Sequence, residues 1–281
     1  MSAPAAAAPL ARHLAGDGAP VVLLNGGLMT WAAWEPVAAP LGRRHAVLRF
    51  DFRGQLATPA PRADGVPTDL AGHAADVAAL LDEVGWGAAH LVGTSFGAEV
   101  AIELAASRPE RARSLVLVTA ADRSTPGFDE QSAELHDLVA DVLAGGDRGR
   151  FHDAVVERVY SAAWREANAG ALAARRAAMG QLPASWFAGA GRLVAAVEGF
   201  DLRQRLAEVR CPASVVAAAD DRVFGTAPSH ALAAALGAGL EIHPTSGHAL
   251  VGEDPGWLVG VVLDFLAGFE EAPEARREAG R

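Results

Sequence analysis

The sequence predicts an α/β fold: a mostly parallel sheet flanked by helices, with a helical insertion between its late strands. Two observations predict it. Short apolar segments alternate with longer amphipathic ones along most of the chain, and one long stretch in the second half interrupts that alternation. Parallel strands are joined by crossover connections, so helices are expected on both faces of the sheet.

Six segments are predicted to be buried strands. Each is a short apolar run bounded by turn residues, which is typical of a parallel strand covered on both faces. They are Val21–Asn25, His45–Asp51, Ala89–Gly93, Ser114–Ala120, Ala213–Ala219 and Leu240–His243.

Four segments between or after these strands are predicted to be helices. Thr68–Val84 follows Pro67 and places Leu70, Val77 and Leu81 on one face. The others are Phe96–Ser107, Ser229–Leu236 and Pro255–Phe269.

Residues 122–209 contain no convincing strand and have a helical composition. This stretch leaves one predicted strand and returns to the next, so both of its ends lie at the carboxyl edge of the sheet, where open sheets bind ligands. We therefore expect a lid over a site, the alternative being a helical extension with no role there. The predicted division is a core of residues 1–121 and 210–269, a lid of residues 122–209, and a disordered charged tail of residues 270–281.

Composition and charge favour a protein that binds a small-molecule substrate. The net charge of −10 argues against nucleic acid and against anionic membrane surfaces. No apolar stretch approaches the roughly 20 residues of a membrane span, and the N-terminus lacks the basic region of a signal peptide. The single cysteine, Cys211, cannot form an internal disulfide and is interpreted as a buried filler. A cytoplasmic protein is expected, with no prediction of its oligomeric state.

The segment Gly93-Thr94-Ser95-Phe96-Gly97 is a G-x-S-x-G motif. It stands between a predicted strand and a predicted helix, the setting in which a nucleophilic serine is exposed on a tight turn. The helix N-terminus would direct positive charge at a developing oxyanion. The alternative is a structural turn with an incidental serine.

A nucleophilic serine needs a base, and the base needs a carboxylate to orient it. His248 follows the predicted strand Leu240–His243, and Asp221 follows Ala213–Ala219. Both therefore belong to the same edge of the sheet as Ser95. We predict a catalytic triad of Ser95, Asp221 and His248, with the adjacent Asp220 as the alternative acid.

Two backbone amides are expected to form an oxyanion hole. One belongs to Phe96, the residue after the serine. The other is expected in the loop Asn25-Gly26-Gly27-Leu28, with Gly27 preferred to Leu28. The alternative is a simple Gly-Gly turn that ends the strand.

The chain resembles the α/β-hydrolase superfamily, especially its small esterase and enol-lactonase-like branch. The stretch VVLLNGGLMTWAAW matches the opening of that family, with Asn25 in place of the usual histidine and Trp34 at the expected tryptophan. The segment from Asp51 to Gln55 resembles the D-x-R-G-x-G-x-S loop, with Leu56 where the second glycine is usual. The G-x-x-D-R-V pattern of the family matches Asp221 as the acid. The resemblance implies hydrolysis through an acyl-enzyme without a cofactor.

Further residues are candidates for the substrate pocket. Leu28 and Met29 follow the predicted oxyanion loop, and Trp186 and Phe187 could form an apolar ceiling in the lid, although packing within the lid is an equal alternative. Glu99, one turn into the helix after Ser95, is expected to be buried with a hydrogen-bond partner. No cluster has metal-ligand spacing and no phosphate-binding loop occurs, so neither a metal nor a cofactor is predicted.

Three functions are compatible with these residues. The first is hydrolysis of a carboxylic ester, thioester or lactone of a small-to-medium apolar substrate. The second is carbon–carbon bond hydrolysis, perhydrolysis or acyl transfer by the same triad. The third is a non-catalytic ligand receptor on the same fold.

Overall fold

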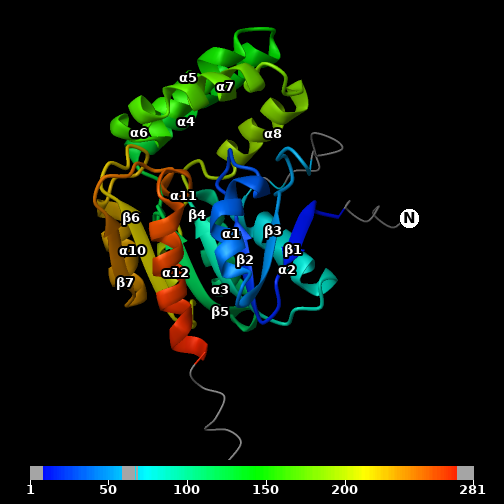
Figure 1. Ribbon diagram of the computed structural model, residues 1–281, viewed down its shortest axis with the longest axis vertical. Coiled ribbons are helices and arrows are strands. Elements are labelled where there is room, and N and C mark those ends of the chain that lie inside the picture. Colours follow the sequence, from blue (N-terminus) through cyan, green and yellow to red (C-terminus); the bar gives the residue numbers. More distant parts are fainter. Residues whose placement is uncertain (1–8, 59–66, 68, 271–281) are drawn as a thin grey trace, which may run out of the picture.

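Seven strands form one sheet in the order β1-β3-β2-β4-β5-β6-β7 (Figure 1). The structure, a computed structural model, describes residues 9–58, 67 and 69–270. β1 pairs antiparallel with β3, and all other neighbouring strands are parallel. This confirms the predicted fold class. The strands are β1 Arg12–Ala15, β2 Ala19–Leu24, β3 His45–Phe50, β4 Ala89–Thr94, β5 Ala112–Val118, β6 Ala213–Ala218 and β7 Gly239–His243.

The edge strand β1 was not predicted from the sequence. All four of its residues are exposed, so no apolar pattern marks it. It forms because its backbone pairs with Val47–Phe50 of β3, a long-range contact. A short exposed strand is a common way to end a sheet.

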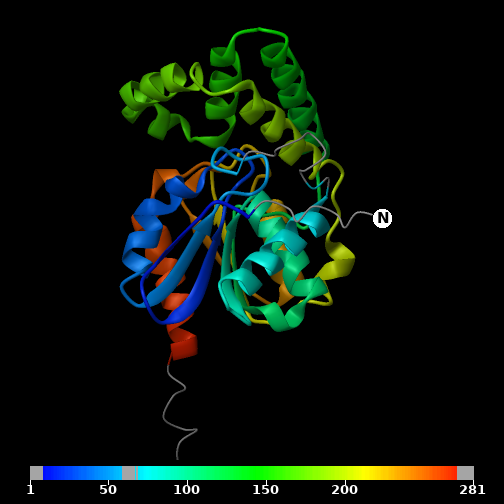
Figure 2. The ribbon, with the colours of Figure 1, turned by 90° about the vertical axis from the view of Figure 1, so that its right-hand side faces the viewer.

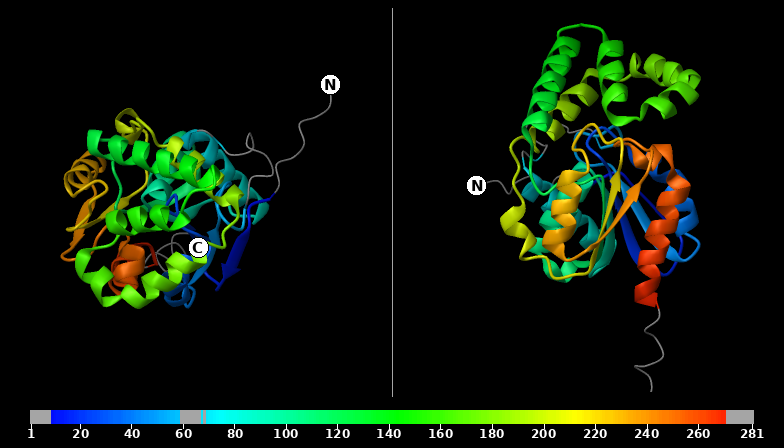
Figure 3. Two further views of the ribbon diagram at one scale, coloured as in Figure 1. Left: turned by 90° about the horizontal axis from the view of Figure 1, so that it is seen from above. Right: turned by 90° about the vertical axis from the view of Figure 1, so that its left-hand side faces the viewer.

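Helices cover both faces of the sheet (Figure 3). One face packs against α2 (Leu70–Glu83), α3 (Phe96–Ser107) and α10 (Ala227–Leu236). The other packs against α1 (Glu35–Leu41) and α12 (Pro255–Glu270). The start of α2 is capped by Asp69, whose carboxylate accepts from the Gly72 amide at 2.8 Å. The predicted first residue of this helix, Thr68, lies outside the described residues.

The helical insertion joins β5 to β6 and lies over one end of the sheet (Figures 1 and 2). It has a core of its own, built by Val139, Val142, Phe151, Trp186, Phe187 and Ala190. Its helices are α4 Pro126–Leu143, α5 Arg148–Val159, α6 Ala162–Ala167, α7 Ala169–Met179 and α8 Ala184–Ala195, whereas the short α9 Arg203–Leu206 that follows packs against α3 of the core.

The two ends of the insertion lie side by side. Arg123 and Asp201 form an isolated antiparallel bridge. The Ser124 amide donates to the Phe200 carbonyl, and the Leu202 amide donates to the Asp122 carbonyl, both at 2.8 Å. The insertion therefore joins the core through a narrow, hydrogen-bonded neck.

The chain ends lie largely outside the described residues. The predicted disordered tail begins at Glu270, which the structure places at the end of α12. The rest of that tail, residues 271–281, lies outside the described residues. Within residues 9–58, 67 and 69–270, no helix is both long and apolar enough to cross a bilayer.

Candidate active site

Ser95 occupies a sharp turn between β4 and α3. Its backbone has φ 49° and ψ −127°, which non-glycine residues rarely adopt. The turn needs glycines on either side of it. A Cβ on Gly93 would collide with the Gly97 carbonyl, and a Cβ on Gly97 would collide with the Leu24 carbonyl. Strained backbone of this kind is concentrated at functional sites.

The side chains of His248 and Asp221 are joined by a hydrogen bond. His248 Nδ1 lies 2.9 Å from Asp221 Oδ2, and both residues are buried. The other carboxylate oxygen, Oδ1, accepts from the amides of Val223 and Phe224 at 2.8 and 3.1 Å. Because Nδ1 is bonded to the carboxylate, Nε2 of His248 is the ring nitrogen left to bond a group in the cavity. The wall of that cavity also includes Ser95.

Asp220 does not contact His248. Its side chain is 39% exposed and faces Arg222, with 3.4 Å between Asp220 Oδ1 and Arg222 Nε. The structure thus brings one of the two adjacent carboxylates, that of Asp221, to the histidine.

The loop that carries His248 is stabilised by contacts with the last residue of the preceding strand, β7. His243, at the end of β7, accepts from the Ser246 amide through Nδ1 at 3.0 Å. Its Nε2 atom lies 3.3 Å from a carboxylate oxygen of Asp254, and its ring packs edge-on against Trp257. These contacts give His243 a structural role in the loop.

The same loop is held by Glu253, which the sequence analysis did not identify. Glu253 Oε1 accepts from the Gly247 amide at 3.1 Å and from the Ser161 amide at 2.6 Å. Its Oε2 atom accepts from the Ser161 hydroxyl at 2.7 Å. One carboxylate therefore links the loop of His248 to the insertion between α5 and α6.

The Gly26-Gly27 loop after β2 is fixed by buried side chains. Gln55 donates to the Gly26 carbonyl at 2.8 Å and to the Gly27 carbonyl at 3.3 Å. Asn25 donates to Gln55 Oε1 at 2.8 Å and to the Asp51 carboxylate at 3.1 Å. Burial raises the pKa of Asp51, although hydrogen bonds from neighbouring amides and from Asn25 act in the opposite direction. Gln55 had no sequence signal beyond its place in the family's loop.

Gly27 lies close to Phe96. A Cβ on Gly27 would stand 3.8 Å from the Phe96 Cβ and 4.0 Å from the Leu193 Cβ of α8. Within the described part of the chain, the amides of Gly27, Leu28 and Phe96 donate to no protein acceptor, whereas the Gly26 amide donates to Met29 Sδ. Three backbone donors therefore remain for a ligand at this point.

A cavity of about 800 Å³ lies between the carboxyl edge of the sheet and the insertion. Ser95 and His248 line it on the side of the core, together with Leu28, Met29 and Phe96. On the side of the insertion, its wall includes Leu135, Val155, Met179 and Leu182. The insertion therefore covers the space in front of Ser95.

Trp186 and Phe187 lie elsewhere than expected. They pack edge-on against each other and against Phe151 in the core of the insertion, and neither lines the cavity. On an amphipathic helix the largest apolar side chains pack into the nearest core, and here that core is the insertion's own. The apolar ceiling expected of these two side chains is instead built by smaller residues.

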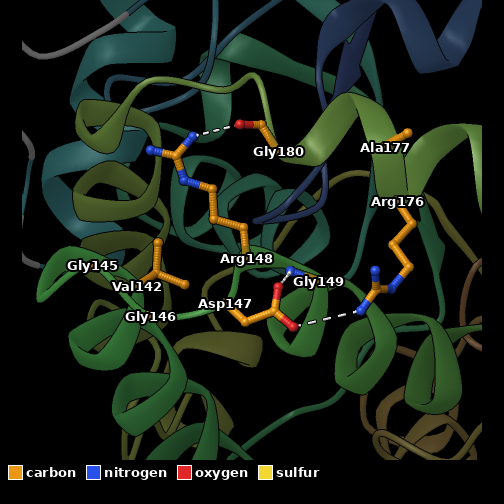
Figure 4. A pocket seen from close by; sticks show the side chains of 9 residues that line it. All are labelled: Val142, Gly145, Gly146, Asp147, Arg148, Gly149, Arg176, Ala177 and Gly180. Carbon is orange, nitrogen blue, oxygen red and sulfur yellow. Dashed lines mark hydrogen bonds and ion pairs between the residues drawn. The ribbon is translucent and has the colours of Figure 1, made fainter.

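A second, open cavity of about 460 Å³ lies within the insertion and away from Ser95 (Figure 4). Arg148 donates there to the Gly180 carbonyl at 2.7 Å, and Arg176 lies near Asp147. Its polar groups are thus paired with each other. Among the described residues, no group of three or more histidine, cysteine or acidic side chains is placed to hold a metal ion.

Comparison with known proteins identifies the family. The alpha/beta hydrolase fold family matches residues 19–255 of the chain. The chain belongs to the alpha/beta hydrolase family. This confirms the resemblance found in the sequence, and it agrees with the order of the strands and with the turn at Ser95.

Relatives within the alpha/beta hydrolase family differ in the substrates that their names give. A protein from Caulobacter sp. (strain K31), named carbamate hydrolase RutD, is 31% identical over 253 residues, or 88% of this chain and 90% of that protein. The 2-hydroxy-6-oxo-2,4-heptadienoate hydrolase of Pseudomonas putida is 30% identical and matches 91% of each chain. The enol-lactonase of Burkholderia xenovorans LB400 superposes with a TM-score of 0.78 at 25% identity, over 92% of this chain and 96% of that one.

Proposed function

We propose that this alpha/beta hydrolase is a serine hydrolase that cleaves a carboxylic ester, thioester or lactone of a small-to-medium apolar substrate. The observation that carries the proposal is that His248, which is hydrogen-bonded to the buried Asp221, lines the same cavity as Ser95. A serine on a strained turn, a histidine and an orienting carboxylate are the parts of a nucleophilic triad.

In this proposal Ser95 attacks the substrate carbonyl carbon with its Oγ atom. His248 Nε2 accepts the hydroxyl proton, and Asp221 stabilises the imidazolium that results. The proton then passes to the leaving group as its bond to the carbonyl carbon breaks. Water hydrolyses the acyl-enzyme by the same steps, with His248 again as the base, and Ser95 regains its proton.

The negative charge on the carbonyl oxygen is stabilised by backbone amides. Phe96 supplies one donor at the N-terminus of α3, where the helix dipole adds positive charge. Gly27 supplies the second donor, and its own carbonyl accepts a hydrogen bond from the Gln55 side chain, which fixes the peptide. Loss of one donor of this kind costs roughly 10²–10³ in kcat.

The substrate class follows from the walls of the cavity. The side chains near Ser95 and across from it are mostly apolar, and each one that a substrate covers contributes roughly 1–3 kcal/mol. Acyl groups of moderate length with a mostly apolar surface therefore fit the space best.

The proposal is tested by covalent labelling followed by a substrate panel. A fluorophosphonate should modify Ser95 in the wild type, and Ser95→Ala should abolish both labelling and turnover while circular dichroism stays unchanged. Labelling of another residue, or activity in the variant, would contradict the assignment. The panel should contain esters, thioesters and lactones, with a carbamate and a 2-hydroxy-6-oxo-2,4-heptadienoate added because relatives carry those names.

A further inference from the structure

Glu99 places a carboxyl group in the wall of the cavity, one helical turn after Ser95. It is only 1% exposed to solvent and lines the cavity in front of Ser95. Residues four apart lie on the same side of a helix, about 6 Å apart along its axis. The mechanism proposed above gives this group no role.

Within the described residues, the contacts of Glu99 compensate a negative charge with backbone amides alone. Glu99 Oε1 accepts from the Ala121 amide at 3.1 Å, just after β5. The charged group that faces it from the loop after β6 is the Asp221 carboxylate, behind which lies His248. The nearby acids are engaged elsewhere, Glu103 with Arg205 and Asp122 with Arg123.

Burial, with a smaller contribution from the Asp221 carboxylate, raises the pKa of Glu99 to about 8, against the opposing effect of the backbone amides of Ala121 and of Glu99 itself. At neutral pH the side chain is therefore mainly a neutral carboxylic acid, which carries one O–H donor. Moving a cationic substrate group from water to this apolar wall costs far more free energy than moving a neutral acceptor, whose cost is offset by the hydrogen bond from Glu99.

The apolar side chains of the cavity wall would make an O–H donor at Glu99 discriminate between ligands with and without an acceptor. The same cavity wall contains Val197, Phe200 and Phe224, none of which can accept a hydrogen bond through its side chain. A site built around a buried polar group discriminates strongly against ligands that leave the group unpaired.

We propose that Glu99 is a specificity-determining residue that donates a hydrogen bond to an oxygen atom in the acyl group, a few bonds from the scissile carbonyl. The preferred substrates are then oxo-acyl esters, thioesters or lactones, in preference to hydrocarbons of the same shape. This inference rests on the proposed function, because it places the acyl group beside Ser95.

Matched substrates test the inference. The phenyl esters of 4-oxopentanoic and 4-methylpentanoic acid have nearly the same shape and differ in one acceptor oxygen. The measurement is the ratio of their kcat/KM values between pH 6 and pH 9. In the wild type, the ratio should favour the oxo ester by about tenfold at pH 6–7 and fall as the pH passes 8.

Two variants separate hydrogen bonding from packing. Glu99→Gln keeps a donor that cannot ionise, so its ratio should stay high and independent of pH. Glu99→Met keeps the shape without the donor, so its ratio should be about tenfold lower at every pH. Equal ratios in all three proteins would overturn the inference. So would a preference for the phenyl ester of 4-aminobutanoic acid, because it would mean that Glu99 binds a cation.

Failure of the proposed function is detected separately. Fluorophosphonate labelling of Ser95 and turnover of either ester report on the serine hydrolase itself. If neither ester is cleaved, calorimetric Kd values for the same pair measured with Ser95→Ala still give the ratio. A Glu99-dependent preference in binding would support the inference, and its absence would overturn it.

Discussion

At the residue scale, two carboxyl groups near Ser95 differ in their surroundings. Asp221 is engaged by His248 and by two backbone amides, whereas Glu99 has backbone amides alone as favourable partners among the described residues. Two groups of the same chemistry can therefore serve different purposes in one site: we propose that the first orients the histidine and that the second donates a hydrogen bond to a ligand.

The first prediction concerns the acid. Asp221→Asn should lower kcat by about 10⁴, because an amide favours the wrong tautomer of His248. Asp220→Asn is the matched control, since its side chain faces solvent and Arg222, and it should change kcat by less than about threefold. Steady-state kinetics on one ester decides between them, and the reverse order would assign the acid to Asp220.

The second prediction concerns the stability of the protein as a function of pH. The folded state keeps a proton on Glu99 up to about pH 8, whereas the unfolded chain releases it near 4.5. Stability contributed by this group is therefore full below pH 4.5 and is lost as the pH rises through 8. The loss is on the order of a few kcal/mol.

Glu99→Gln should remove that pH dependence. Urea unfolding at pH 5, 7 and 8.5 should show the variant gaining free energy of unfolding relative to the wild type as the pH rises. Because all other groups titrate in both proteins, the difference between the two isolates Glu99. A constant difference across the range would mean that Glu99 is ionised in the folded state at neutral pH.

At the scale of elements, the insertion and the loop of His248 are joined directly. Glu253 accepts from the Gly247 amide and from the amide and hydroxyl of Ser161, and the Ala249 amide donates to the Val159 carbonyl at 2.7 Å. Since Gly247 and Ala249 flank His248, a displacement of the insertion would displace the histidine.

The third prediction tests this connection. Glu253→Ala leaves three buried or half-buried donors without an acceptor, which should cost a few kcal/mol of stability. It should also lower kcat about tenfold or more, because small displacements of a catalytic group are costly. Glu241→Ala, on the exposed side of β7, is the control. A variant that is less stable but keeps its kcat would show that the link is structural only.

At the scale of the whole molecule, the cavity is formed by two units that each have a core. The sheet supplies Ser95 and His248, and the insertion supplies the opposite wall. The size of the acyl group that fits therefore depends on how the insertion is seated on the sheet. The insertion and the core are in close contact, since a Cβ on Gly189 of α8 would collide with the Gly54 carbonyl of the core.

The fourth prediction concerns acyl chain length. Leu182→Trp should shorten the preferred acyl chain, because Leu182 lines the cavity and a larger side chain takes up part of its 800 Å³. Trp186→Ala should leave the preference unchanged and lower stability by roughly 3–5 kcal/mol, because Trp186 packs inside the insertion. A kcat/KM series of esters and a thermal melt measure both effects, and the opposite pattern would place Trp186 at the substrate.

The sequence by itself determined the six parallel strands, the place of the insertion, the family and the candidate residues Ser95, Asp221 and His248. Apolar periodicity and turn residues are local signals, and the G-x-S-x-G turn depends on the steric needs of adjacent glycines. Only the tertiary structure decided features that depend on long-range contacts. These are the exposed edge strand β1, the pairing of Asp221 rather than Asp220 with His248, and the roles of Gln55 and Glu253.

The structure also decided which apolar residues of the insertion face the cavity. Helix periodicity shows that Trp186 and Phe187 are buried, but it cannot distinguish the core of the insertion from the wall of a site, because both bury apolar surface. The charge of Glu99 is decided in the same way: its pKa depends on burial and on Asp221, which lies 122 residues further along the chain.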